Sequence, residues 1–412
     1  MKFSIPGLCF LTSSSPLEFN TDGHITRFDP TDQMNRDAGQ ILILTTPHVP
    51  LFNLKSIPAI SLFDTIDLPD NFHVPAIYDG FHDLHNKNIL IMMLNGWGDM
   101  ILIQPALHAF YRKGASAGAP PRITIGCNWI NNFPYPGVPY IHHVCPNIMT
   151  LKELCDFDIL VNLVPANYQR TPQFSMRDIY FQIMKIEGEY GGREAPVLQP
   201  APQRIEKIKP VLYDIRRKTD KKLLCVNWKS RFPHKNASAE LFFRIVHGLS
   251  HDYQAILFKD EEASRIMQKE IDEAKMPVIN LSSLIQDYHD TTAALSLMDA
   301  LISVDTGIVH AAGAMGIPGV ALFGPFPPET HVADYPSIVG IRAPYSSKNC
   351  QGPCLETHRG CAEVGYSPDT ASPCFQAIEI DQVLQTLEEI TSRCLGFKKT
   401  KAARNKACVF SS

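Results

Sequence analysis

The chain has 412 residues, enough for two or three domains, because single hydrophobic cores rarely grow far beyond ~250 residues. A hydrophobic content of 45% and a charged content of 19% are ordinary for a globular protein and exclude a disordered chain. The net charge of -4 gives no electrostatic signature for a polyanion, so we expect no nucleic-acid partner. The sequence holds no run of about 18 apolar residues and so predicts no membrane span.

The start of the sequence and the cysteines indicate the compartment. Met1 to Cys9 contains one lysine and an apolar stretch that a proline interrupts, which is too short for an export signal. The 11 cysteines are an odd total in a long chain, and this argues against a secreted disulfide framework. We therefore expect a cytoplasmic protein.

Residues 1–86 differ in pattern from the rest of the chain. They carry short apolar runs, such as Ile41–Leu44 and Ala59–Phe63, which Pro, Asp and Asn separate, and they show no long helical periodicity. This pattern predicts a small β-rich N-terminal appendage.

Residues 87–200 alternate strand and helix patterns. Asn88–Leu94 is a continuous apolar run, typical of a strand buried on both faces of a parallel sheet. A glycine-bearing turn at Asn95–Asp99 follows, and Ile101–Phe110 then shows helical spacing. With further strands expected at 122–126, 142–144 and 157–163, the segment predicts a doubly wound, Rossmann-like α/β lobe.

Residues 201–392 repeat this alternation after an expected interlobe connection at Leu198–Pro202. Two successive lobes predict a cleft between them, with ligands at the carboxyl ends of the strands, and residues 393–412 form a C-terminal tail. Strands are expected at 222–227, 254–258, 278–281, 300–304 and 319–323, and helices at 238–249, 261–274, 290–298 and 307–315.

The segment from Ser303 to Pro325 holds the strongest candidate site. A predicted strand stops at Asp305, Thr306 and Gly307 begin a helix, and His310 follows one helical turn later. The N–H groups at a helix N-terminus suit a diphosphate, and Thr306 adds a hydroxyl donor. From the residues alone, a simple helix-capping role for Asp305 stays equally open.

The same segment resembles a known family. Its pattern Asp-Thr-Gly-x-x-His-x-Ala, followed by Gly-x-Pro and Leu-Phe-Gly-Pro, is similar to the donor-site segment of glycosyltransferase family 9, the ADP-heptose heptosyltransferases of lipopolysaccharide core synthesis. Gly96–Asp99 followed by Gln104–Leu107 is similar to the N-terminal motif of that family. The resemblance covers about residues 87–392. It implies a GT-B fold, with two Rossmann-like lobes facing a cleft, and inverting sugar transfer without a catalytic metal.

By this resemblance, Asp99 matches the general base that deprotonates the acceptor hydroxyl, while a cap at the helix start is its alternative role. Lys235 matches the phosphate-binding lysine of the donor site. Because the segment departs from the family pattern by about one inserted residue, Lys229 and Arg231 remain competitors.

A glutamate that contacts the nucleoside ribose in the family matches Glu262, or its neighbour Glu261. Acidic residues in the first turn of a helix also suit the helix dipole, and the glycine that the family often has in this turn is missing. The resemblance assigns the remaining donor-binding roles to Asp305, Thr306, Gly307 and His310.

Four of the cysteines cluster within 25 residues as Cys350-x3-Cys354-x6-Cys361-x12-Cys374. Four thiolates can close a tetrahedral site around Fe or Zn, although the spacing is not the usual paired form; free thiols or a fortuitous disulfide are the alternatives. A protein-directed branch of the resembled family uses such a cluster for iron. We therefore expect a structural Fe or Zn here and no cofactor for catalysis.

The resemblance implies transfer of heptose from ADP-heptose to a glycan such as a lipopolysaccharide core, or to a protein side chain. The N-terminal appendage suits recognition of a polypeptide or assembly of a homo-oligomer. Two other readings stay open: a GT-B transferase or epimerase that uses another nucleotide sugar, and a non-catalytic binding protein of the same fold.

Overall fold

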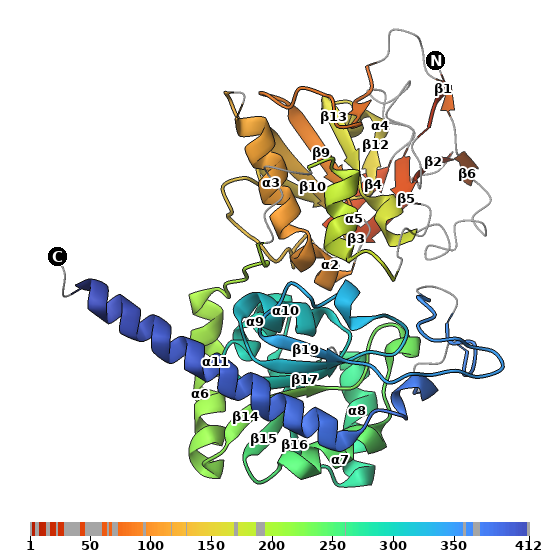
Figure 1. The fold of residues 1–412 in the computed structure, drawn as a ribbon. Coiled ribbons are helices and arrows are strands. Elements are labelled where there is room, and N and C mark those ends of the chain that lie inside the picture. Colours follow the sequence, from red (N-terminus) through yellow and green to blue (C-terminus); the bar gives the residue numbers. More distant parts are fainter. Residues whose placement is uncertain are drawn as a thin grey trace. The chain divides into compact units, whose positions relative to one another are not determined.

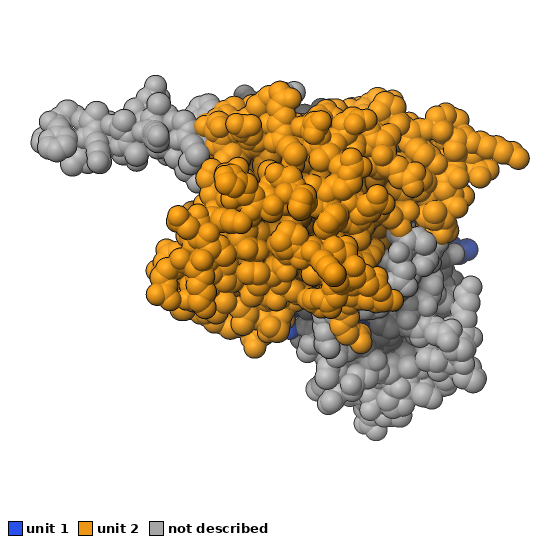
Figure 2. Space-filling view, turned by 90° about the horizontal axis from the view of Figure 1, so that it is seen from below, with its two compact units in different colours: residues 1–170, 176–194 blue, residues 171–175, 195–412 orange. Residues whose placement is uncertain are grey.

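The structure is a computed structural model of the chain (Figure 1). It describes residues 73–409 except 94–95, 117, 129, 169–171, 187–193, 260, 357–359 and 366–370, together with Ser4 and seven strands before residue 68. The chain divides into two compact units, which Figure 2 colours separately. The first unit contains Met1–Arg170 and Met176–Glu194, and the second contains Thr171–Ser175 and Ala195–Ser412.

A five-stranded parallel sheet lies in the first unit, in the order β11-β10-β9-β13-β8. The central strand β9 has the sequence Asn-Ile-Leu-Ile-Met, and its last four residues are buried because both faces of the sheet are covered. The chain reverses its direction of winding between β9 and β13, as in a Rossmann-type sheet. The strands are β8 (Ala76–Ile77), β9 (Asn88–Met92), β10 (Arg122–Cys127), β11 (His143–Pro146) and β13 (Ile159–Asn162).

The helices of the first unit begin with recognisable signals. The single helix expected at 101–110 is two helices that meet at Ile103, and the second has a proline, Pro105, in its first turn. Before α4, Thr150 Oγ1 accepts a hydrogen bond from Glu153 N, and the Glu153 carboxylate accepts one from Thr150 N. The helices are α2 (Trp97–Leu102), α3 (Gln104–Ala115), α4 (Leu151–Leu154) and α5 (Met176–Ile183).

The expected β-rich N-terminal segment is confirmed by seven strands before residue 68. Pairing crosses residue 86, because β12 (Met149–Thr150) pairs with β5 and because β8 joins the parallel sheet. Strand pairing thus does not mark a domain boundary at residue 86, and that boundary stays a prediction. The strands are β1 (Lys2–Phe3), β2 (Leu8–Ser13), β3 (Leu17–Thr21), β4 (His24–Phe28), β5 (Leu42–Thr45), β6 (Ile60–Phe63) and β7 (Ile66–Asp67).

A six-stranded parallel sheet forms the second unit, in the order β16-β15-β14-β17-β18-β19. Counted from β14, this is the 3-2-1-4-5-6 order of the Rossmann fold, and its topological switch point lies between β14 and β17. The strands are β14 (Lys222–Asn227), β15 (Tyr253–Leu257), β16 (Val278–Asn280), β17 (Ala300–Val304), β18 (Gly319–Leu322) and β19 (Ile338–Ile341).

The helices expected in the second unit are present, and two more were not expected. We expected an extended connection at 198–202, and its last residue, Pro202, is the first residue of α6. A proline is compatible with this position because the N–H that it lacks would have no partner within the helix. The predicted tail from residue 393 continues α11 as a helix. The helices are α6 (Pro202–Thr219), α7 (Ala239–Leu249), α8 (Glu261–Ala274), α9 (Tyr288–Leu295), α10 (Gly307–Met315) and α11 (Ile380–Val409).

Two glycines let α10 pack closely and end sharply. A Cβ on Gly313 would lie 2.3 Å from the ring of Tyr335, so only glycine allows this ring to approach the helix. Gly316 has a φ of +69° and terminates α10 in the left-handed conformation that glycine adopts most easily. The tight packing fixes the position of α10 and of its N-terminus.

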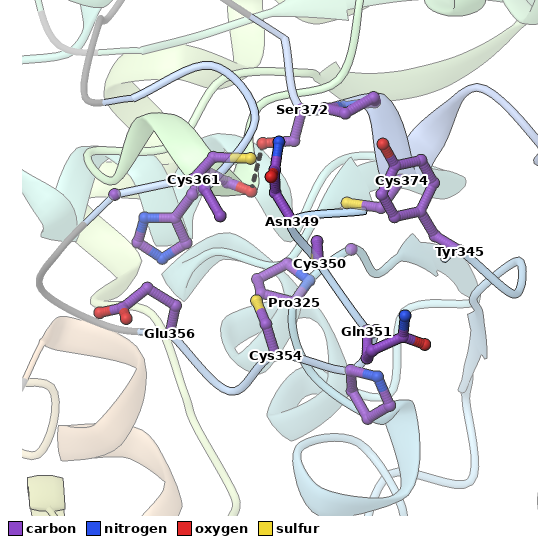
Figure 3. A pocket seen from close by; sticks show the side chains of 17 residues that line it. Pro325, Tyr345, Asn349, Cys350, Gln351, Cys354, Glu356, Cys361, Ser372 and Cys374 are labelled. Atoms are coloured by element: carbon purple, nitrogen blue, oxygen red, sulfur yellow. Dashed lines mark hydrogen bonds between the residues drawn. The ribbon is translucent and has the colours of Figure 1, made fainter. Parts of the chain in front are cut away.

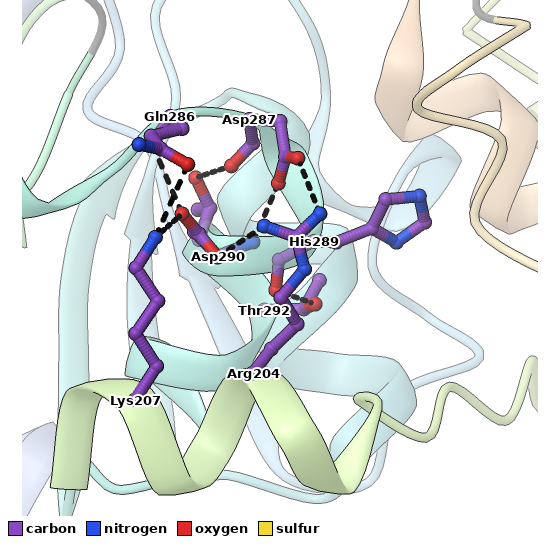
Figure 4. A network of polar contacts seen from close by, with 8 residues as sticks. Arg204, Lys207, Gln286, Asp287, His289, Asp290 and Thr292 are labelled. Carbon is purple, nitrogen blue, oxygen red and sulfur yellow. Dashed lines mark hydrogen bonds and ion pairs between the residues drawn. The ribbon is translucent and has the colours of Figure 1, made fainter.

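Helices α6 and α9 are joined by an ion-pair network around the buried carboxylate of Asp290 (Figure 4). Arg204 and Lys207 on α6 each donate to it at 2.8 Å, and the backbone N–H of Gln286 donates at 3.1 Å. Burial acts to raise the pKa of Asp290, but these donors and the charge of Arg204 lower it below its ordinary value.

We expect the double variant Arg204→Met, Lys207→Met to lose about 3–5 kcal/mol in free energy of unfolding, because Asp290 would remain buried without a cation. Urea denaturation measures this loss, and Asp214→Ala on the exposed face of α6 serves as a control with an unchanged midpoint. In the wild type, the contribution of Asp290 is complete above the ordinary pKa of ~3.9 and declines as the pH falls through the lower folded-state pKa. Equal midpoints for the double variant and the control would contradict the assigned role.

Candidate active site

The carboxyl edge of the second sheet brings two of the predicted donor-site residues together. Asp305 directly follows β17 and is buried, and Lys235 ends the short 3-10 helix η5 (Pro233–Lys235) that follows β14. Lys235 Nζ lies 2.7 Å from Asp305 Oδ2 and 4.9 Å from the centre of the Phe326 ring. Two segments that the sequence separates therefore meet at the switch point of the sheet.

The charge of Asp305 is maintained by its neighbours. Burial acts to raise its pKa, but the positive charge of Lys235, the nearby His331 and His310, and the hydrogen bond from Lys235 hold the pKa well below its ordinary value. Asp305 is thus a carboxylate that fixes Lys235 in place. Because an ammonium group carries three N–H donors, Lys235 can hold Asp305 and also donate to a phosphate.

The N-terminus of α10 lies at the same edge. Its N-cap is Thr306, so the alternative in which Asp305 caps the helix is wrong. The Thr306 side chain makes no capping hydrogen bond, and Gly307 is the first helical residue. His310 is buried one turn further on, with its ring centre 6.4 Å from that of His331. The arrangement has the donors and the dipole of an anion site.

The two competing cations lie in different surroundings. The Lys229 ammonium is buried and lies 2.8 Å from Glu270 Oε1 on α8, while Trp228 Nε1 donates to Glu270 Oε2 at 2.5 Å. Arg231 is exposed. Lys229 therefore ties the segment after β14 to α8, and Lys235 is the cation paired with Asp305 at the edge beside α10.

The predicted ribose contact is not placed. Glu262 is the second residue of α8, but its side chain, like that of Glu261, lies outside the described residues. Its role stays a prediction.

Asp99 lies in the first unit, in the first turn of α2. Its Oδ2 accepts a hydrogen bond from Gly96 N at 3.2 Å, which is the contact of a capping carboxylate. The hydroxyl of the buried Tyr180 on α5 donates to Oδ1 at 3.3 Å. Asp99 thus follows the central strand β9 at the switch point of its own sheet, where a doubly wound sheet places its ligands.

The four clustered cysteines line one cavity of about 330 Å³ together with His234 (Figure 3). Burial, together with neighbouring Cys361 and Cys354, raises the pKa of Cys374 to about 12. Sulfur donors of this kind suit Fe or Zn. Within the described part of the chain, however, no three Cys, His, Asp or Glu side chains stand close enough to hold a metal ion.

Sequence reasoning missed several residues of the second-unit site. His331 and Phe326 come from the segment after β18, and Asn227 ends β14. The signal was available for Asn227, since it is a polar residue at the carboxyl end of a predicted strand. It was not available for His331, because only the folded chain brings its ring towards Asp305.

Comparisons with known proteins agree with the resemblance seen in the sequence. Residues 198–358 match the model of glycosyltransferase family 9 (heptosyltransferase). The structure is similar to a family 9 glycosyl transferase from Veillonella parvula, with 16% identity, a TM-score of 0.56, and coverage of 76% of this chain and 99% of that one. It is also similar to ADP-heptose lps heptosyltransferase II of E. coli, with 12% identity, a TM-score of 0.53, and coverage of 74% and 99%. A search of curated proteins finds no match.

The fold and the family match together define the class: this chain is a glycosyltransferase of the GT-B fold, with two Rossmann-like units. It carries a glycosyltransferase family 9 domain in its second unit. Among the described residues, no helix is long and apolar enough to cross a membrane.

Proposed function

We propose that this chain transfers heptose from ADP-heptose to an acceptor hydroxyl, with inversion at the anomeric carbon. The observation that carries the proposal is the Lys235–Asp305 pair beside the α10 N-terminus in a family 9 domain. Charge builds on the diphosphate oxygen as the leaving group departs, and an ammonium group with helix N–H donors stabilises it. No metal takes part in this step.

The proposed roles follow the two units. Asp99 in the first unit takes the proton of the acceptor hydroxyl as that oxygen attacks the sugar. In the second unit, Lys235, Thr306 and Gly307 bind the diphosphate. Asp305 holds Lys235 in place, and His310 completes the donor site one helical turn further along α10. Glu262 contacts the ribose.

The experiment is an assay of ADP release from ADP-heptose, with UDP-glucose and GDP-mannose as competing donors. Acceptor fractions are a lipopolysaccharide core oligosaccharide and a set of cytoplasmic polypeptides, and mass spectrometry identifies the product. Addition of a heptose to either fraction supports the proposal and selects the acceptor class. An altered free nucleotide sugar without transfer would instead identify an epimerase.

We also propose that the four cysteines of this cavity draw together around a structural Fe or Zn; they line one space, although among the described residues they do not stand close enough to hold an ion without this movement. Purified protein is then expected to contain about one metal ion per chain by elemental analysis. Cys361→Ser and Cys374→Ser should lose the metal and lower the melting temperature, because metal binding contributes to folding. Cys155→Ser in the first unit is the control and should keep the metal. A metal-free wild type with an unchanged melting temperature after chelation would exclude the site.

A further inference from the structure

A polar cluster lies behind the N-terminus of α10, at the switch point of the second sheet. Asn227 is the last residue of β14 and pairs in register with Ser303 on β17. Its side chain is buried, and Nδ2 lies 3.2 Å from Ser303 Oγ and 3.3 Å from Thr306 Oγ1. The cluster therefore joins the end of one strand to the N-cap of the proposed donor-binding helix.

The direction of the hydrogen bonds in this cluster is fixed by Ser303. Its hydroxyl donates to the backbone oxygen of Val304 at 2.7 Å, so its own hydrogen is already used. The Asn227 atom that contacts Ser303 Oγ must then be the amide nitrogen. This nitrogen carries two hydrogens, one for the Ser303 oxygen and one for the Thr306 oxygen. The Thr306 oxygen accepts one of them at 3.3 Å, and the contact between Thr306 and Ser303, in which Thr306 would have to donate, has the same length and is too long to hold the Thr306 hydrogen firmly. The Thr306 hydrogen can consequently turn towards an anion at the α10 N-terminus.

The oxygen of the Asn227 amide differs from the nitrogen in its surroundings. Asn227 Oδ1 is buried, and within the part of the chain that the structure describes it has no hydrogen-bond partner. An acceptor left in this state is unfavourable for folding, since it has lost its hydrogen bonds to water. Within the described residues, the nitrogen is thus the atom through which the Asn227 amide makes its contacts.

We infer that Asn227 is a positioning residue of the donor site, which orients the Thr306 hydroxyl so that its hydrogen is directed to the diphosphate. The inference rests on the proposed function and deepens it, because it assigns to Thr306 a hydrogen bond to the diphosphate and to Asn227 the control of that bond. In this inference Asn227 acts through Thr306.

The test is a double-mutant cycle on ADP binding, measured by calorimetry. Asn227→Leu keeps the approximate size of the side chain and is expected to weaken ADP binding roughly tenfold, as for one hydrogen bond to a charged group. Thr306→Val should weaken it by a similar factor. The double variant should bind ADP no more weakly than Thr306→Val alone, because the two residues act as one unit.

Asn147→Leu is the matched control. Asn147 is a buried amide in the first unit that donates to Met93 O, and its replacement should leave the affinity for ADP unchanged. If Asn227→Leu does not fold, Asn227→Asp replaces it, because a carboxylate would draw the Thr306 hydrogen away from the diphosphate and should weaken ADP binding further.

The inference would be overturned if the two losses of ADP affinity multiplied in the double variant, or if an Asn227 variant bound ADP as tightly as the wild type does. Neither result would contradict the proposed donor site. A wild type that binds no nucleoside diphosphate would instead remove the proposed function.

Discussion

An Asp99→Asn variant is expected to transfer sugar roughly 10²–10⁴-fold more slowly than the wild type, the range typical for loss of a general base. The amide still offers an oxygen to Gly96 N, so α2 keeps its starting contact, but the amide cannot accept the proton of the acceptor hydroxyl. The rate of ADP release in the presence of acceptor measures the effect. ADP should still raise the melting temperature of the variant, because the donor site lies in the second unit.

Glu153→Gln is the control for Asp99→Asn. Glu153 occupies the same third helical position at the start of α4 and makes the same contact to a backbone N–H, but it is outside the proposed site. Its replacement should leave transfer unchanged. If both variants transferred sugar at the wild-type rate, Asp99 would be a helix cap and another residue would have to serve as the base.

Replacing Lys235 with alanine is expected to weaken ADP binding by roughly 10–100-fold, because a charged hydrogen-bond donor to the diphosphate is lost. The variant should also lose about 3–5 kcal/mol in free energy of unfolding, since Asp305 would stay buried without its cation. Combining Lys235→Ala with Asp305→Asn should recover much of this stability and none of the ADP affinity. Calorimetry and urea denaturation separate the two effects.

Lys229→Ala distinguishes the competing lysine. It removes the buried pair with Glu270 and should lower stability, while the folded protein keeps its affinity for ADP. The opposite pattern, in which Lys229→Ala abolishes ADP binding and Lys235→Ala leaves it intact, would assign the phosphate to Lys229 and contradict the proposed site.

The sequence predicts the second unit well because its strands are continuous apolar runs bounded by polar residues. The expected helices at α8 and α10 have the observed bounds, and Ser238 marks the start of α7 as a cap. Helix α6 was missed because Pro200 and Pro202 favour an extended chain, although a proline at the first helical position is fully compatible with a helix. Two-residue strands such as β8 and β12 are defined by their partners and carry too little pattern of their own.

In the candidate active site too, the sequence predicts the residues of one continuous segment better than residues that distant segments bring together. Asp305, Thr306 and His310 could be found because they lie in one continuous motif. The sequence alone left Lys235 and Lys229 as rivals, and they differ through contacts with distant segments, Asp305 for the first and Glu270 for the second. Asn227 was missed because its significance lies in hydrogen bonds to the neighbouring strand and to Thr306, which no local spacing shows.

The most direct test of the account is a thermal-shift titration of the wild type with ADP, UDP and GDP, because a ligand that binds only the folded state raises the melting temperature. We predict a selective rise with ADP, as expected for a donor site that takes ADP-heptose. A selective response to UDP or GDP would contradict the proposed donor, and no response to any of the three would contradict a nucleotide-sugar site at Lys235, Asp305 and the α10 N-terminus.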